Sequence, residues 1–275
     1  MTDQSSENAL PQGALERLKG TTTGDHRGVF TSDLSVNEFL LVREAGFEPV
    51  ALVMGSCIYH VGIQYGKWSQ NQEMDVLSQA MYSAREAAMS RMRQEAADVS
   101  ADGIVGVRLE VKLLPWDSNL LEFLAIGTAI VHSKGAETFK GPNGLPFTSD
   151  LSGQDFWTLL QSGHRPLEMV MGSCVYHIAH QGTMRSLGNI GKNTEIAVFS
   201  QALYSARELA MERMQQEAMA VKAEGVTGVV VHEKNYNWDS HVIEFFAIGT
   251  AVVPIHDESI SPELAKPQVV LSVNG

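Results

Sequence analysis

Positive charge is scarce in this sequence, and its scarcity excludes two classes of partner. The 275 residues carry 20 Lys and Arg against 32 Asp and Glu, a formal net charge of −12. No basic run interrupts this balance, whereas surfaces for nucleic acid or anionic membranes need clustered Lys and Arg. No apolar run reaches the roughly 18–20 residues that span a bilayer, and residues 1–6 lack the features of a signal peptide. We therefore expect a cytoplasmic protein with no nucleic-acid and no membrane partner.

Cysteines and catalytic motifs are also few. Cys57 and Cys174 are the only cysteines, which is too few for a disulfide framework and fits a reduced compartment. Gly55-Ser56-Cys57 could offer a nucleophile, but the sequence has no Asp/His pair at a known spacing and no glycine-rich phosphate loop. Enzymatic activity is therefore not expected.

The chain is instead rich in internal repetition. The stretch Met54–His60 returns as Met171–His177, and Phe30 corresponds to Phe147, an offset of 117 residues. In the long helical stretches Ser78 corresponds to Ser200, an offset of 122, because the second copy has five more residues in the preceding loop. These offsets predict a flexible N-terminal tail, two domains, a linker and a C-terminal tail, with bounds 1–29, 30–132, 133–146, 147–254 and 255–275. Helical spacing of Leu10, Ala14, Leu15 and Leu18 leaves open that the N-terminal tail is a docking peptide.

Each repeat has the pattern of a small α+β domain. Ser35 and Glu38 form the capping-box pattern of a short leading helix. Apolar residues at steps of three and four predict a long helix between Ser69 and Gly103, with Asn71 as its N-cap. Strands follow, and Leu120–Val131 is apolar on both faces, which predicts burial against the long helix on one side and another subunit on the other. We expect an antiparallel sheet packed on one long helix, twice.

Motifs in the helix and the hairpin resemble a known family. Ser83-Ala84-Arg85-Glu86-Ala87 and its copy at 205–209 lead through Asp102–Val107 into a hairpin that ends Gly127-Thr128-Ala129. This pattern resembles the YbjQ-like family, also called the putative heavy-metal-binding domain, over nearly all of each repeat. The resemblance implies a dodecin-like α+β fold and pentameric rings. For a tandem chain it implies a homo-oligomer of five subunits and ten domains, stacked in two layers or arranged around one larger circle.

The repeated motif also contains candidate metal ligands. Thiolate and imidazole are suitable donors for zinc or copper, and the motif supplies Cys57, His60, Cys174 and His177. Residues three apart on one strand face opposite sides, so a bulge at Gly55 or ligands from a neighbouring domain would be needed. The alternative is a buried structural cysteine beside a hydrogen-bonded histidine, with no cofactor.

Two carboxylates interrupt the apolar strands. Glu122 and Glu244 would be costly to bury alone, and Arg85 and Arg207 on the long helices are their natural partners. We expect structural ion pairs, which could cross a subunit interface.

The sequence therefore favours a non-enzymatic, self-assembling homo-oligomer, a pentameric ring or a larger ring-based shell that serves as scaffold or compartment. The alternative is a heavy-metal-binding or thiol-responsive protein that uses the paired Cys-x-x-His motifs. A third hypothesis is a ring whose cavity holds a small ligand. The tails could bind a protein partner or cargo.

Overall fold

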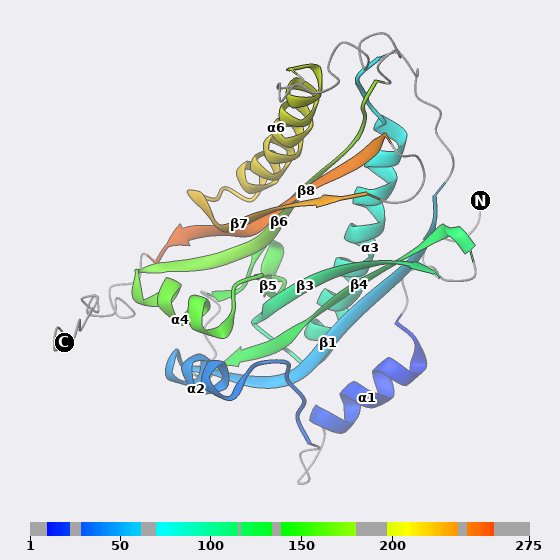
Figure 1. Ribbon diagram of the computed structural model, residues 1–275. Coiled ribbons are helices and arrows are strands. Elements are labelled where there is room, and N and C mark those ends of the chain that lie inside the picture. Colours follow the sequence, from blue (N-terminus) through cyan, green and yellow to red (C-terminus); the bar gives the residue numbers. More distant parts are fainter. Residues whose placement is uncertain are drawn as a thin grey trace, which may run out of the picture.

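The computed structural model describes most of the chain (Figure 1). The described ranges are 10–22, 29–61, 70–114, 117–133, 139–179, 197–235 and 241–255. Within them the expected α+β class and the tandem arrangement are confirmed. The expected C-terminal tail beyond Ile255 and the longer loop of the second repeat lie outside the described residues.

Two four-stranded sheets hold the two repeats. The first part of the chain forms the helices and strands α1 (Gln12–Thr22), α2 (Val36–Glu44), β1 (Phe47–His60), β2 (Gln72–Glu73), α3 (Asp75–Asp98), β3 (Gly103–Leu114) and β4 (Asp117–His132). The second part forms η2 (Pro142–Gly144), β5 (Phe147–Thr148), α4 (Gly153–Gln161), β6 (His164–His177), α6 (Ala197–Ala220), β7 (Gly225–Lys234) and β8 (Val242–Pro254). Sheet A has the order β1-β4-β3-β5, and sheet B has the order β2-β6-β8-β7. Each sheet therefore includes a short strand from the other repeat.

Local sequence explains where α2 begins and ends. The Ser35 side chain accepts from the Glu38 N–H, and the Glu38 carboxylate accepts from the Ser35 N–H, so the predicted capping box is confirmed. Gly46 follows the helix with φ of +86°, a conformation that glycine adopts without a Cβ penalty. The chain then turns directly into β1.

The long helix α3 follows the predicted periodicity but starts later than expected. It runs from Asp75 with Met74 at the N-cap, so the prediction of Asn71 as N-cap is wrong. The Asn71 side chain instead accepts from the Ala179 N–H of the second repeat, because β2 has joined β6 at this point.

The elements form layers in the order α6, sheet B, α3, sheet A, with α1 beside β1 (Figure 1). One face of α3 contacts sheet A, and another contacts Met169, Met171 and Phe246 of sheet B within a single apolar cluster. Strand β8 is consequently buried on both faces, by α6 and α3 of the same chain. Strand β8 is the counterpart of Leu120–Val131 in the second repeat, and for β8 the expected burial against another subunit is therefore wrong.

The N-terminal segment is partly ordered against the first repeat. Residues Gln12–Thr22 form α1, whose Leu18 side chain is 2% exposed in the core cluster. The Arg17 guanidinium contacts the Leu52 carbonyl and the Glu95 carboxylate, at 2.8 and 2.5 Å. The expected flexible tail is thus wrong for this helix, because its apolar side docks on the domain.

Candidate functional site

The repeated motif is the point where each long helix crosses its strand. A Cβ built on Gly55 would lie 2.1 Å from the Ala88 carbonyl oxygen, and one on Gly172 would lie 2.0 Å from that of Ala210. Only glycine permits this approach of helix backbone to strand backbone. The motif's glycines therefore have a packing role in both repeats.

Replacing Gly55 with alanine is expected to lower the free energy of unfolding by about 2 kcal/mol or more, because the new methyl group meets rigid backbone. Urea denaturation followed by circular dichroism measures the change. Gly13→Ala is the control, since nothing lies within 4 Å of that Cβ position and alanine favours the helix. Equal stability of Gly55→Ala and wild type would contradict the close approach.

The structure does not bring the four candidate metal ligands together. The pairing of β1 with β4 is regular from Ala51 to His60, so no bulge occurs at Gly55. Cys57 accordingly faces the α3 side with the core, and His60 lies exposed on the opposite face. In the second repeat Cys174 is buried in the cluster under α6, while His177 Nδ1 contacts the Gln70 carbonyl oxygen.

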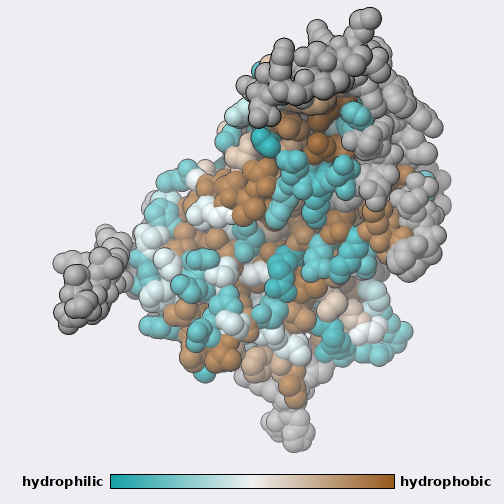
Figure 2. Space-filling model, in the orientation of Figure 1, coloured by the Kyte–Doolittle hydropathy of each residue, from teal (hydrophilic) through white to brown (hydrophobic). Residues whose placement is uncertain are grey.

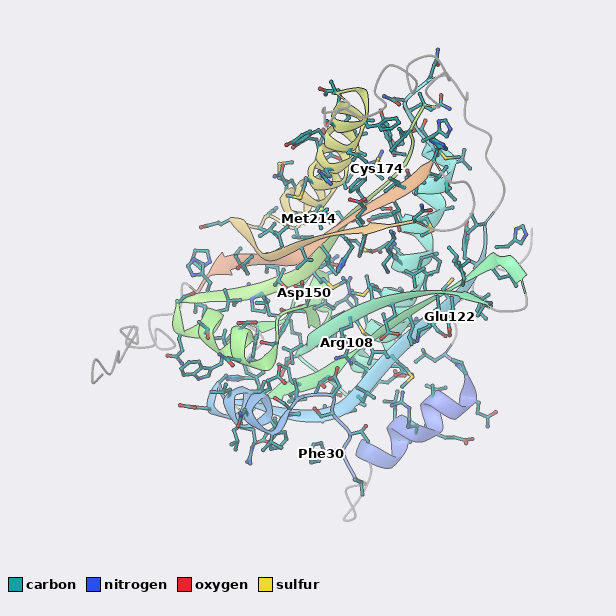
Figure 3. The ribbon with its side chains drawn as sticks, viewed as in Figure 1. Phe30, Arg108, Glu122, Asp150, Cys174 and Met214 are labelled. Carbon is teal, nitrogen blue, oxygen red and sulfur yellow. The ribbon has the colours of Figure 1, made fainter. Side chains whose placement is uncertain are left out.

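Cys174 is a buried, neutral thiol. Burial, with the nearby Glu73 carboxylate, raises the pKa of this thiol to about 12. Figure 3 shows Cys174 on the same side of sheet B as Met214 of α6. Within the described ranges no three His, Cys, Asp or Glu side chains gather as a metal site. These residues do not fit a metal centre within one chain.

Arg85 lies in the contact between α3 and sheet B, which we call the joint between the repeats. This fully buried guanidinium binds both carboxylate oxygens of Glu244 on β8, at 2.7 and 3.0 Å. It also donates to the Ser173 hydroxyl and lies 3.9 Å from the centroid of the Phe246 ring. Because both charges are buried and paired bidentately, this contact fixes how α3 sits on sheet B.

Two further polar contacts join the same face of α3 to the second repeat, one through Glu217 of α6 and one directly to β6. The Tyr82 hydroxyl donates to Glu217 Oε1, and Glu217 Oε2 accepts from the Met171 N–H at 2.7 Å. The Ser78 hydroxyl accepts from the Val175 N–H at 2.8 Å. Burial raises the pKa of Glu217 to about 7, although the two hydrogen bonds lower it.

The other two predicted ion-pair residues lie apart. Arg207 pairs with Glu233 on the exposed side of β7, at 3.2 Å. Glu122 lies half-buried on β4, far from α6 in the layers of Figure 3, and forms no ion pair with the described residues. Arg85 thus meets the glutamate of the other repeat, while Arg207 and Glu122 each lack such a partner within the described chain.

Sequence reasoning overlooked Ser78, Tyr82 and Glu217. The signal was present, because Ser-x-x-x-Tyr-x-x-Arg occurs at Ser78 and again at Ser200. Polar residues repeated on one helix face, off the apolar stripe, indicate a second contact surface.

Comparisons with known proteins agree with this duplication. A family model described as putative heavy-metal-binding, YbjQ, matches residues 69–133 and 164–254. An encapsulin nanocompartment protein of Mycobacterium tuberculosis is 50% identical over 239 residues, which cover 86% of this chain and 91% of that protein. UPF0145 proteins of Listeria ivanovii and Listeria monocytogenes are 34% identical over 67 residues, 24% of this chain and 56% of each relative. No described helix is both long and apolar enough to cross a membrane.

Proposed function

Because the chain belongs to the YbjQ-like, putative heavy-metal-binding family and carries its domain twice, we propose that it assembles with copies of itself into a ring-based scaffold or compartment. The assembly is a pentameric ring of chains or a shell built from such rings, and it works without catalysis. The family resemblance supports the ring, and the nanocompartment relative supports the compartment. The tails are candidates to hold cargo or a protein partner.

One observation carries this proposal: the two repeats are covered unequally. Every described residue of β8 from Glu244 to Val252 is buried, because helices lie on both faces of sheet B. On sheet A the corresponding outer face is covered only in part, by α1, and Ile58 there is 61% exposed. At the other end of the layers α6 is also uncovered, because its Tyr204 side chain is 63% exposed.

Strand β7 is similarly open. Its side chains Val229, Val230 and Val231 are 39–47% exposed, and apolar surface lies over the region of β7 and the adjoining end of α6 in Figure 2. Contiguous exposed apolar surface marks an interaction site, and burying it is worth about 25 cal/mol per Å². A standard interface of about 1,600 Å² would therefore hold the copies firmly.

The test is size-exclusion chromatography with light scattering on the full chain at micromolar concentration, followed by electron microscopy. We expect a discrete particle of many times 30.0 kDa, unchanged by a chelator such as EDTA. A monomer would contradict the proposal. Stoichiometric zinc or copper, with collapse of the particle in EDTA, would favour the metal-binding alternative instead.

A further inference from the structure

Each of the two surfaces that meet in the joint, the face of α3 and the face of sheet B, occurs a second time in the molecule. These second copies, on α6 and on sheet A, do not contact each other within the chain. Resting on the proposed function, we propose that the outer face of α6 docks on the outer face of sheet A of a second copy. The docking repeats the register of α3 on sheet B. Here the outer face of α6 comprises Ser200, Tyr204, Arg207 and Met211. The outer face of sheet A comprises Met54, Ser56, Ile58, Glu122 and Leu124.

The helix side of the joint is repeated nearly residue for residue. On α3 the face turned toward the second repeat comprises Ser78, Tyr82, Arg85 and Met89, and the offset of 122 turns these into the four residues on α6. Arg85 is fully buried and Met89 is 2% exposed. The Arg207 side chain is instead 42% exposed and Tyr204 is 63% exposed. The same surface is therefore covered once and uncovered once.

The sheet side is repeated in the same way. Val175 lies opposite Glu244 in sheet B, and Ile58 lies opposite Glu122 in sheet A. Two residue pairs further along the strands, and therefore on the same face, Ser173 lies opposite Phe246, and Ser56 lies opposite Leu124. The carboxylate that receives a guanidinium in sheet B thus has a counterpart at the same register position of sheet A, with no ion pair among the described residues.

Three polar contacts follow from this register. Arg207 of one copy would bind Glu122 and Ser56 of the next, as Arg85 binds Glu244 and Ser173. Ser200 would accept from the Ile58 N–H, as Ser78 accepts from that of Val175. Tyr204 would donate to Glu95, the counterpart of Glu217, which already accepts from the Met54 N–H at 2.9 Å.

The edge of β7 supplies independent support. In sheet A, β5 pairs with β3 through Gly103–Phe147 and Ile104–Thr148, and residues 103–105 of β3 are buried. The corresponding residues 225–227 of β7 are only half-buried, and among the described strands of sheet B none takes the place of β5 beside β7. The counterpart of β5 is Phe30-Thr31, and Phe30 is 48% exposed at the lower edge of Figure 3. The second copy would add this segment to β7.

Helix α1 lies on part of this surface. Arg17 uses Glu95 Oε2, and the cleft there is lined by α1 together with Met54, Ser56 and Ile58. In the second repeat the corresponding cleft lies between α3 and α6, lined by Tyr82, Ser173 and Glu217. Since α1 stands where α3 stands in that cleft, docking of α6 requires α1 to move away from Glu95.

The proposed contact joins two different surfaces, so it is head-to-tail and leaves each chain with one surface of each kind. Mixing tests this directly. Tyr204→Asp spoils only the helix surface, and Ile58→Asp spoils only the sheet surface. We expect each variant alone to be monomeric at micromolar concentration. An equimolar mixture should form a one-to-one dimer of about 60 kDa, twice the 30.0 kDa chain.

Native mass spectrometry reads out the masses, and circular dichroism checks that each variant is folded. Leu145→Asp is the control, because Leu145 is 45% exposed and belongs to neither of the two surfaces, and this variant should assemble like wild type. If the variants still form the wild-type particle, the proposed register is wrong but self-assembly stands. The same holds if the mixture of the two variants stays monomeric while wild type assembles. A monomeric wild-type chain would overturn both.

Charge exchange tests the residue pairing. Arg207→Glu and Glu122→Arg should each raise the concentration needed for assembly at least 10-fold. The double variant, in which each copy carries both changes, should recover most of that loss. A double variant no better than either single one would overturn the Arg207–Glu122 pair.

Discussion

Arg85→Ala is expected to lower the free energy of unfolding by about 3–5 kcal/mol, because it leaves the Glu244 carboxylate buried without its cation. Glu244 is 1% exposed and cannot turn toward water. The Ser173 hydroxyl donates to a Glu244 carboxylate oxygen at 2.7 Å, but a neutral hydroxyl does not replace the lost positive charge. Thermal and urea unfolding of the full chain measure the loss.

Two matched variants separate the lost charge from lost packing. Arg85→Leu combined with Glu244→Leu removes both charges and keeps apolar volume, so its stability should return to near that of wild type. Arg43→Ala removes an exposed pair with Glu48, whose side chains are 51% and 52% exposed, and should change stability by less than about 1 kcal/mol. A mild effect of Arg85→Ala would mean that the joint does not depend on this contact.

The stability of the chain should fall between about pH 5 and pH 7.5 through Glu217. Burial raises the pKa of this carboxyl from 4.5 to about 7 in the folded chain, so the folded state holds a proton that the unfolded state has released. The contribution is complete below pH 4.5 and is lost as the pH rises through 7. Since one pH unit corresponds to about 1.4 kcal/mol, the change reaches about 3 kcal/mol at most.

Glu217→Gln isolates the contribution of this carboxyl from that of every other ionisable group in the chain. The amide keeps the volume and cannot ionise, although one of the two accepted hydrogen bonds is lost. We therefore expect the variant's unfolding free energy, measured in urea, to fall less steeply over this window than that of wild type. Parallel pH profiles would show that Glu217 is ionised in the folded chain.

Most of the fold was accessible from the sequence because its signals are local. The capping box at Ser35, the three-and-four spacing along α3 and the alternation along β3 each depend on neighbours within a few residues. The prediction of Asn71 as an N-cap failed because its side chain accepts from the Ala179 N–H, more than a hundred residues away in the sequence. The strand exchange of β2 and β5 between the repeats is long-range in the same way.

The site was harder to predict for a related reason. The sequence indicated that Glu244 needs a cation, and Arg85 and Arg207 were the two candidates. A duplicated sequence offers each acceptor two equal donors, so it cannot say which repeat supplies the partner. Only the layering of α3 between the sheets decides that Arg85 serves Glu244.

The joint of α3 with sheet B also limits how many domains a closed circle of chains can contain. Each whole chain contributes one joint that is covalently enforced and one that must be made on meeting another molecule, and the two alternate around the circumference. The number of domains in such a circle is therefore always even. Duplication thus removes every odd-numbered closure from those that a single-domain chain could form.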